Sequence, residues 1–471
     1  MGNAEPDKIL LLDFVSEQNR GDAAIQIGLV ELTRMYFPNA TLVAIAEIGA
    51  NQKQWLTEHY EYTLKRKVPV CGGLWHTSYP LGKRQNDRRS HSLPLLKFVR
   101  NILSLMINVC FLVAIAMRIF RPLLCKFLPR ALRETLRHFY EADLVIWRGR
   151  NFRSRKEVLK EIYHTFKLVY SPLVCIMIGK PVACVGASVW PLRSPISRFL
   201  LKLVFKRCFV VTLRDRPSFN ILRKLLSGDA SKLALLPDLS FAALKDLSQL
   251  CAVRCRGPEV KKTSYKRLGV TIVDWREAGT AARERYVKAM RQILSYVLSD
   301  PNTEVFVVPQ VTKAWESPLS VLEEIVAVFP AETKGRLHVI EGSLDIEKLL
   351  ALYQTMDALV ATRMHSAVFA LSVGTPVLAV RYDVGPKWDI LDQLGIKEYI
   401  VNYGDDEARI LSKFKKMWKG DYPLSHVERN LDTFYRTVGD NIKLVREEYG
   451  KIYSAKSGRR AAKEGECHFN V

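Results

Sequence analysis

The sequence predicts an α/β protein with two Rossmann-like domains that face a cleft. Three observations lead to this prediction. The chain has 471 residues, which is too long for one ordinary core. Apolar runs of strand length alternate with segments of helical periodicity, as they do in parallel α/β sheets. The alternation occurs twice, before and after a basic, polar stretch at 254–267 that we interpret as a linker.

The N-terminal domain is expected at 1–255. It opens with a buried strand, a polar loop that contains Gly21, a helix and a second strand, which is how a parallel α/β sheet begins. The alternation stops near residue 70, resumes at Asp143 and ends at Leu236-Pro237-Asp238. The predicted strands are 8–15, 41–48, 143–147, 181–186 and 208–213, and the predicted helices are 23–37, 196–206 and 217–226.

The C-terminal domain is expected at 265–430 and repeats the same alternation. A helix at 431–453 is predicted to return to the N-terminal half. The basic tail at 454–471 is predicted to be disordered. The predicted strands are 268–274, 304–308, 337–340, 358–360 and 377–380, with a long helix at 281–298 after the first of them.

A basic insert at about 83–137 interrupts the N-terminal domain. It holds twelve Lys or Arg residues and two acids, and seventeen mostly apolar residues separate Arg100 from Arg118. That run is near the lower limit of ~17–25 residues for a membrane span. A single crossing would separate the first β-α-β unit from the rest of its sheet. We therefore expect 93–128 to form an interfacial or re-entrant membrane-binding unit, and a helical insertion packed on the domain is the alternative.

The charge balance points to anionic partners. The chain has 71 Lys and Arg against 48 Asp and Glu, a net charge of +23. This excess favours phosphorylated substrates or anionic lipid, and no nucleic acid is expected as a partner. The nine cysteines are scattered, and Cys175, Cys184 and Cys208 lie in apolar runs typical of buried thiols. With no secretory signal at the start of the sequence, we expect a cytoplasmic protein at the inner face of the membrane.

The strongest candidate site is the turn after the strand at 358–360. Ligands of open α/β sheets bind where strands end and helices begin, because free N–H groups and the helix dipole favour anions there. Arg363 offers a planar fork for phosphate or carboxylate, and His365 can move a proton near neutral pH. The structural alternative is that Arg363 pairs with an acid and His365 caps the helix, for which Thr362 and Ser366 are further cap candidates.

Three further turns carry candidate residues. In Asn19-Arg20-Gly21-Asp22, Gly21 allows a tight turn, and Asp22 is either a helix cap or a carboxylate that binds or deprotonates a hydroxyl. Arg214 precedes a helix that starts near Pro217, and Arg276 follows the strand that ends at Asp274. No P-loop, GxGxxG fingerprint, catalytic Ser-His-Asp triad or paired metal carboxylates appear, so neither a cofactor nor a metal is expected.

Taken together, these turns resemble the polysaccharide pyruvyl transferase family over nearly the whole chain apart from the insert and the tail. The order and spacing of the motifs carry the resemblance. The chain departs from the family pattern at Arg148-Gly-Arg-Asn151 and in the loop from Gly186 to Pro191. The matching positions are Asn19 to Asp22; Arg214, Asp215 and Ser218; Pro237 and Asp238; Gln310; and Asp357, Arg363, His365, Gly374, Pro376 and Tyr382.

The resemblance implies a glycosyltransferase B-like fold and transfer of pyruvate from phosphoenolpyruvate to a sugar, which gives a ketal. The implied acceptor is a polysaccharide or a lipid-linked oligosaccharide. The implied site uses His365 and Asp22 in catalysis. Donor or acceptor binding would fall to Arg363, Arg214, Arg276, Asn19, Gly21, Gln310 and Tyr382.

Two other functions are compatible with these residues. The first is a glycosyltransferase of the same fold with a nucleotide-sugar donor, which donor competition would distinguish. The second is a basic protein without turnover that binds anionic lipid or nucleic acid, and it predicts salt-dependent binding alone.

Overall fold

The computed structural model describes residues 5–49, 53–75, 94–116, 128–227, 230–254, 265–275, 279–308, 319–330, 333, 335–340, 342 and 344–467. Two compact units make up the chain. The first contains residues 1–16, 29–237 and 439–471, and the second contains residues 17–28 and 238–438. Helix α1 (Arg20–Tyr36) therefore contributes its first turns to the second unit and the rest to the first.

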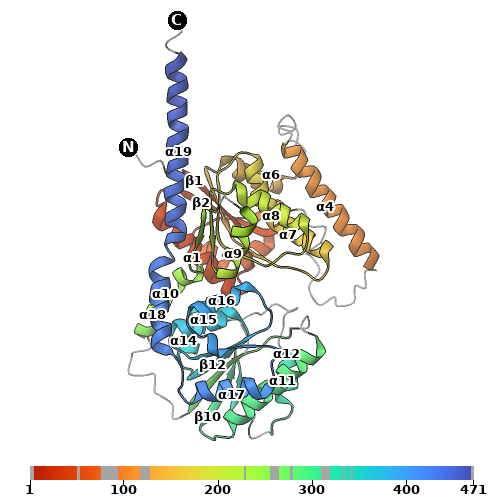
Figure 1. Cartoon of the computed structure of the whole chain (residues 1–471), viewed down its shortest axis with the longest axis vertical. Coiled ribbons are helices and arrows are strands. Elements are labelled where there is room, and N and C mark those ends of the chain that lie inside the picture. The colour runs from red at the N-terminus through yellow and green to blue at the C-terminus, as the bar shows by residue number, and fades with distance from the viewer. Residues whose placement is uncertain are drawn as a thin grey trace. The chain divides into compact units, whose positions relative to one another are not determined.

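The first unit is built on a parallel sheet with the strand order β3-β2-β1-β4-β6-β7-β8, and β5 pairs with β6 (Figure 1). Its central strands are buried along their length, as expected for a sheet covered by helices on both faces. The strands are β1 (Lys8–Phe14), β2 (Thr41–Gly49), β3 (Val70–Gly73), β4 (Leu144–Arg148), β5 (Asn151–Phe152), β6 (Val182–Val189), β7 (Val210–Leu213) and β8 (Leu233–Leu235).

The helices of the first unit pack on that sheet, and the long C-terminal helix α19 (Asp440–Cys467) contacts β6 and β7. Asn441 fixes its start, since its side chain accepts a hydrogen bond from the Thr212 hydroxyl and donates one to the Pro237 carbonyl at 3.0 Å. The other helices are α2 (Lys53–His59), α3 (Glu61–Lys65), α4 (Pro94–Ala116), α6 (Arg130–Glu141), α7 (Val158–Met177), α8 (Pro195–Arg207) and α9 (Arg216–Leu226).

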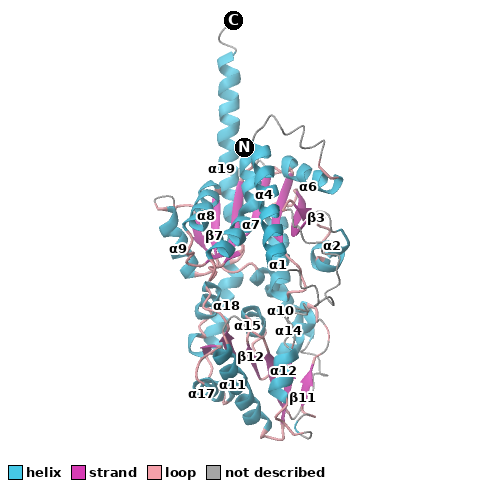
Figure 2. Cartoon of the chain, turned by 90° about the vertical axis from the view of Figure 1, so that its right-hand side faces the viewer, coloured by secondary structure: helices cyan, strands magenta, loops and turns pink. Residues whose placement is uncertain are grey.

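The second unit has its own six-stranded parallel sheet with the order β11-β10-β9-β12-β13-β14, again enclosed by helices (Figure 2). Its strands are β9 (Lys266–Thr271), β10 (Thr303–Val307), β11 (Leu337–Val339), β12 (Ala358–Ala361), β13 (Val377–Arg381) and β14 (Ile400–Asn402). Its helices are α10 (Ser240–Arg254), α11 (Thr280–Leu298), α12 (Leu319–Val326), α14 (Ile346–Gln354), α15 (Met364–Ser372), α16 (Asp389–Gln393), α17 (Glu407–Trp418) and α18 (Leu424–Thr437), with 3-10 turns η4 (Pro386–Trp388) and η5 (Lys397–Tyr399).

Several details differ from the sequence prediction. The first unit resumes at Gly439, and α18 and α19 replace the single helix predicted at 431–453. Residues 454–467, which we expected to be disordered, continue α19, and most of the predicted linker lies outside the described residues. The apolar run of the insert lies in α4 as far as Ala116, and no helix among the described residues is long and apolar enough to cross a membrane. Cys175, Cys184 and Cys208 are buried thiols, as predicted.

Candidate active site

The turn between β12 and α15 holds the predicted Arg363 and His365. Thr362 anchors the end of β12 to β9, because its amide donates to the Thr271 hydroxyl at 2.9 Å and its own hydroxyl donates to the Thr271 carbonyl at 2.6 Å. Arg363 then takes an extended conformation directly before α15 and makes no side-chain cap bond. Thr362 is therefore not the helix cap considered from the sequence, and His365, inside the first turn, is not one either.

Ser366 is the remaining cap candidate, and the structure gives it no such bond. Its side chain is fully buried in the first turn of α15. Among the described residues, its hydroxyl has no hydrogen-bond partner. A buried hydroxyl without a partner costs free energy. A ligand oxygen at this helix terminus would remove that cost, and the positive end of the helix dipole favours an anionic ligand.

The N-terminal Asn-x-Gly-Asp motif lies against the same turn, because residues 17–28 belong to the second unit. A methyl group on Gly21 would lie 2.2 Å from Nδ1 of His365 and 2.4 Å from its Cγ. Only glycine lets the backbone approach the imidazole this closely. The structure thus brings together two candidates that are far apart in the sequence.

Asn19 organises this motif and begins helix α1. Its side-chain oxygen accepts from the Gly21 amide at 3.2 Å, and its side-chain amide donates to Asp22 at 2.7 Å. The cap is therefore Asn19 rather than Asp22. This hydrogen bond orients the carboxylate of Asp22, which lies one residue after the glycine that packs on His365.

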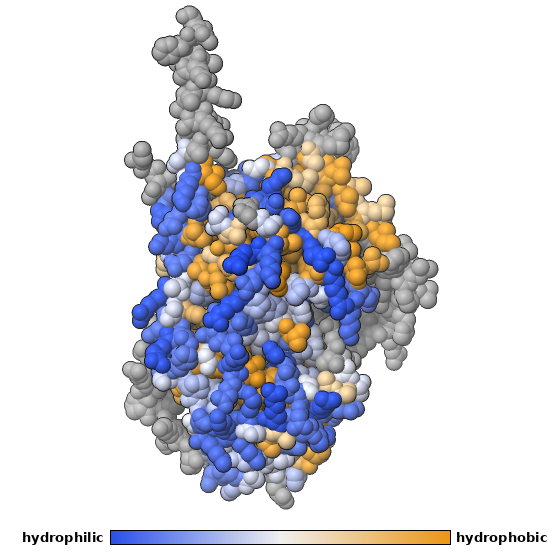
Figure 3. Space-filling view, in the orientation of Figure 1, coloured by the Kyte–Doolittle hydropathy of each residue, from blue (hydrophilic) through white to orange (hydrophobic). Residues whose placement is uncertain are grey.

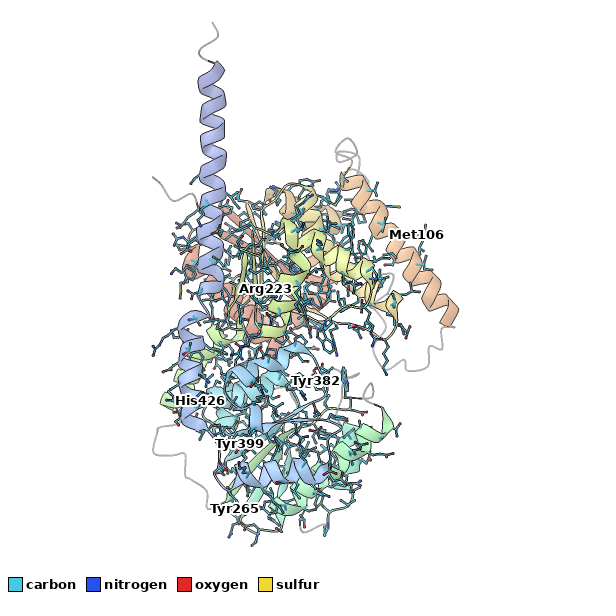
Figure 4. The ribbon with its side chains drawn as sticks, viewed as in Figure 1. Met106, Arg223, Tyr265, Tyr382, Tyr399 and His426 are labelled. Carbon is cyan, nitrogen blue, oxygen red and sulfur yellow. The ribbon has the colours of Figure 1, made fainter. Side chains whose placement is uncertain are left out.

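Tyr382, labelled in Figure 4, follows β13, the strand next to β12. It lies in an aromatic cluster. Its ring centroid is 4.6 Å from that of Trp275, which follows β9, and 5.8 Å from that of Trp388. The Lys387 amine donates to the Tyr382 hydroxyl at 2.9 Å and pairs with Asp383 at 3.2 Å. Sequence reasoning missed Trp275 and Lys387. The Gly-Pro-Lys-Trp turn after a predicted strand was the available signal for Lys387.

Arg214 lies in a strand-to-helix turn of the first unit, between β7 and α9. It is buried, and its Nε donates to the Ser188 hydroxyl at 2.8 Å. Asp215 caps α9 by accepting from the Ser218 amide at 2.8 Å, and it also accepts from Ser188. The Ser218 hydroxyl accepts from the Val189 amide at 2.7 Å. The Arg-Asp-x-x-Ser motif therefore closes a structural network that holds Arg214 in place.

A second group of charges lies at the carboxyl edge of the first unit's sheet. Arg150 and Lys167 pair with Glu47 at 3.1 and 2.7 Å. Burial alone would raise the pKa of Glu47, but these two cations hold it well below its usual value. Burial and the charges of Arg155, Arg150 and Lys167 lower the pKa of His164 to about 4. Cations outnumber the Glu47 carboxylate at this edge, and burial together with these cations favours the neutral form of His164.

Two predicted site residues, Arg276 and Gln310, lie outside the described residues. Across the part of the chain that the structure describes, no three His, Cys, Asp or Glu side chains gather as metal ligands would. In the second unit, the described candidates can supply a proton carrier, a carboxylate and cations. In the first unit, they can supply an arginine that hydrogen bonds hold in place.

A model of the polysaccharide pyruvyl transferase family matches residues 19–384. The chain belongs to this family. It is therefore a transferase. The match begins at Asn19, the residue that caps α1, and includes the β12–α15 turn and Tyr382. The family predicted from the order of the motifs is confirmed.

Three solved structures illustrate the shared architecture. Staphylococcus aureus MnaA with UDP is 12% identical, with a TM-score of 0.54 over 89% of this chain and 90% of its own. UDP-GlcNAc 2-epimerase from Neisseria meningitidis, bound to UDP-GlcNAc, is 12% identical with a TM-score of 0.53 over 93% and 98%. Glycyrrhiza uralensis UGT73P12 is 12% identical with a TM-score of 0.54 over 98% and 99%. At this identity they confirm the glycosyltransferase B-like fold alone.

Proposed function

We propose that the protein transfers pyruvate from phosphoenolpyruvate to two hydroxyls of a sugar, forming a ketal and releasing phosphate. The observation that carries this proposal is the packing of Gly21 against His365 at the start of α15. His365 lies in the first turn of α15, where the helix terminus favours anions, and phosphoenolpyruvate has both a phosphate and a carboxylate.

His365 acts as the proton donor in this proposal. A proton from its imidazolium adds to the enol methylene and leaves an oxocarbenium-like carbon at C2. One sugar hydroxyl adds to C2 and loses its proton, and the C2–O bond to phosphate breaks. The second hydroxyl then closes the ketal and also loses its proton. One hydroxyl proton balances the new methyl group, and the other leaves with the phosphate. In this proposal Asp22, the residue after Gly21, accepts a hydroxyl proton.

The anionic groups of the donor are held by cations and N–H groups. Arg363 grips the phosphate or the carboxylate through its planar fork. The first-turn amides of α15 and the Ser366 hydroxyl offer further donors. Lys387, held by Tyr382 and Asp383 after the neighbouring strand, adds a second cation at this edge of the sheet. Arg214, Arg276 and Gln310 are the remaining binding candidates.

The acceptor is proposed to be a polysaccharide or a lipid-linked oligosaccharide. The electropositive edge around Arg150 and Lys167 in the first unit supports an acceptor with a carboxylate or a phosphate. We further propose that the protein works in the cytoplasm in peripheral contact with an anionic membrane. The net charge of +23 supports this contact.

Donor choice tests the proposal. Titration calorimetry with phosphoenolpyruvate and with UDP-glucose measures donor binding without an acceptor. Phosphate release is then followed with phosphoenolpyruvate and a panel of p-nitrophenyl hexosides and hexuronides. Binding of phosphoenolpyruvate together with acceptor-dependent phosphate release supports pyruvyl transfer. Binding and turnover of UDP-glucose alone would instead establish a nucleotide-sugar glycosyltransferase.

A further inference from the structure

Helix α4 has its polarity reversed relative to a helix on a water-exposed surface. Its polar side chains face the protein, since Ser104 and Asn108 are each only 1% exposed. The Asn108 side-chain amide donates to the Ser104 carbonyl at 2.7 Å, and the Tyr170 hydroxyl of α7 donates to the Asn108 carbonyl at 3.2 Å. These contacts fix which face of α4 is turned inward.

The outward face of α4 is apolar. Met106, for example, is 58% exposed on the outer side of the helix (Figure 4). No charged residue occurs between Asn101 and Ala116. An amphipathic helix in water presents the opposite arrangement, with charged residues outside. Among the side chains of this helix that the structure describes, the exposed ones are Ile102, Leu103, Met106, Ile107, Val109, Cys110, Val113 and Ala116.

The apolar surface continues beyond α4. Helix α7 packs against both α4 and α8, and exposed apolar side chains occur on both neighbours. Figure 3 shows hydrophobic residues gathered over α4 and toward α8. Large contiguous patches of this kind mark contact sites for proteins or membranes. The added residues are Val158 and Leu159 of α7 and Ile196 and Phe199 of α8.

The charge around this surface indicates which partner it binds. Exposed arginines lie on α6, as in Arg133, just before α8, as in Arg193, and on α8, as in Arg198. Arg130 and Arg137 of α6 are exposed as well, but they pair with Glu134 and Glu141. The sequence from 83 to 137 has twelve basic residues against two acids. A second copy of the chain would bring the same positive rim against this one and be repelled. An anionic bilayer would attract the rim and accept the apolar side chains.

We propose that the outward face of α4, continued by α7 and α8, docks in the interfacial layer of an anionic membrane. The helix lies along the bilayer plane, because a crossing helix would lose the hydrogen bond from Tyr170 of α7 and expose the buried Ser104 and Asn108 side chains to lipid. This inference rests on the proposed peripheral membrane contact and is independent of the pyruvyl-transfer chemistry.

Vesicle binding tests the docking surface. The full-length protein is sedimented with vesicles of equal parts phosphatidylcholine and phosphatidylglycerol, and with vesicles of phosphatidylcholine alone. The test variant combines Leu103→Ser, Met106→Gln and Val113→Ser, all on the outward face. Its partition onto the anionic vesicles should fall by about 100-fold, because three apolar side chains no longer enter the lipid.

A matched control combines Met35→Gln, Val328→Ser and Val384→Ser, which are exposed apolar residues outside the proposed surface. It should bind vesicles like the wild type. Equal sedimentation of wild type and test variant would overturn the proposal. So would a wild-type dimer, in the absence of lipid, that the test variant converts to monomer. The wild type and the test variant should release phosphate at the same rate with a soluble acceptor. Failed docking and failed catalysis are therefore distinguishable.

A second measurement does not depend on the triple variant. A Met106→Trp protein should show blue-shifted tryptophan emission with the anionic vesicles, and lipids brominated on their acyl chains should quench it. An unchanged spectrum while the protein sediments with the vesicles would place the membrane contact elsewhere and contradict the proposal.

Discussion

Two strand-to-helix turns, one in each unit, are built differently. In the first unit, Asp215 caps α9 and Ser188 holds Arg214, so the turn is closed by its own side chains. In the second unit, Arg363 makes no cap, and the buried Ser366 hydroxyl has no hydrogen-bond partner among the described residues. The first turn is thus structural as well as basic, whereas the second retains donors for a ligand.

This difference distinguishes two turns that look alike in the sequence. Both turns place an arginine after a strand and before a helix, and both match family motifs. The distinguishing features are a cap in one turn and the approach of Gly21 to His365 in the other. We therefore propose that the chemistry belongs to the second unit, and that the network in the first unit holds Arg214 in position to bind a substrate. Substitutions at the two turns should have different consequences.

The largest effect is expected for His365→Ala. Loss of the proton donor should lower turnover by ~10²–10⁴-fold while phosphoenolpyruvate binding persists. Initial rates of phosphate release and titration calorimetry measure the two quantities. His338→Ala is the matched control, because His338 pairs with Glu304 on a neighbouring strand of the same sheet and should retain turnover. Near-normal turnover of His365→Ala would contradict the catalytic assignment.

Gly21→Ala tests the contact between the N-terminal motif and the turn. The new methyl group would lie 2.2 Å from the imidazole, so the ring or the helix must move. Misplacement by about 1 Å can cost about 100-fold in rate, and we expect a fall of that order in kcat. Gly450→Ala, where no atom lies within 4 Å of the new methyl group, should have no effect. Unchanged kcat in Gly21→Ala would show that the position of His365 is not critical.

A smaller effect is expected for Arg363→Lys. The charge is kept but the bidentate fork is lost, so the dissociation constant for phosphoenolpyruvate should rise about tenfold. Calorimetry measures it, with the exposed Arg409→Lys as the control. If both variants bind the donor like the wild type, Arg363 does not contact it.

The smallest effect is expected for Asp215→Ala in the first unit. Loss of the helix cap should lower the free energy of unfolding by about 1 kcal/mol. Arg363→Ala, at a position without a cap, should change it by less than about 0.5 kcal/mol. Urea unfolding followed by circular dichroism compares them. An equal loss in both variants would remove the structural distinction between the two turns.

The sequence predicted the alternating elements well because strand and helix periods are local signals. Helices α9 and α11 begin within a residue of their predicted starts. The short strands β3 and β14 were missed, because three or four residues give little periodicity. The packing of Gly21 on His365 depends on the tertiary fold, so the sequence supplied both residues but not their contact. Lys387 was missed for the same reason, since its role follows from η4 folding back onto Tyr382.

Transfer of a labelled pyruvyl group tests the central claim most directly. The protein is incubated with phosphoenolpyruvate labelled with ¹³C at C2 and the best acceptor of the glycoside panel, and carbon NMR and a phosphate assay follow the products. We expect one ketal carbon formed per phosphate released by the wild type, and neither product with His365→Ala. Phosphate release with free pyruvate and no ketal, or a ketal yield that His365→Ala leaves unchanged, would contradict it.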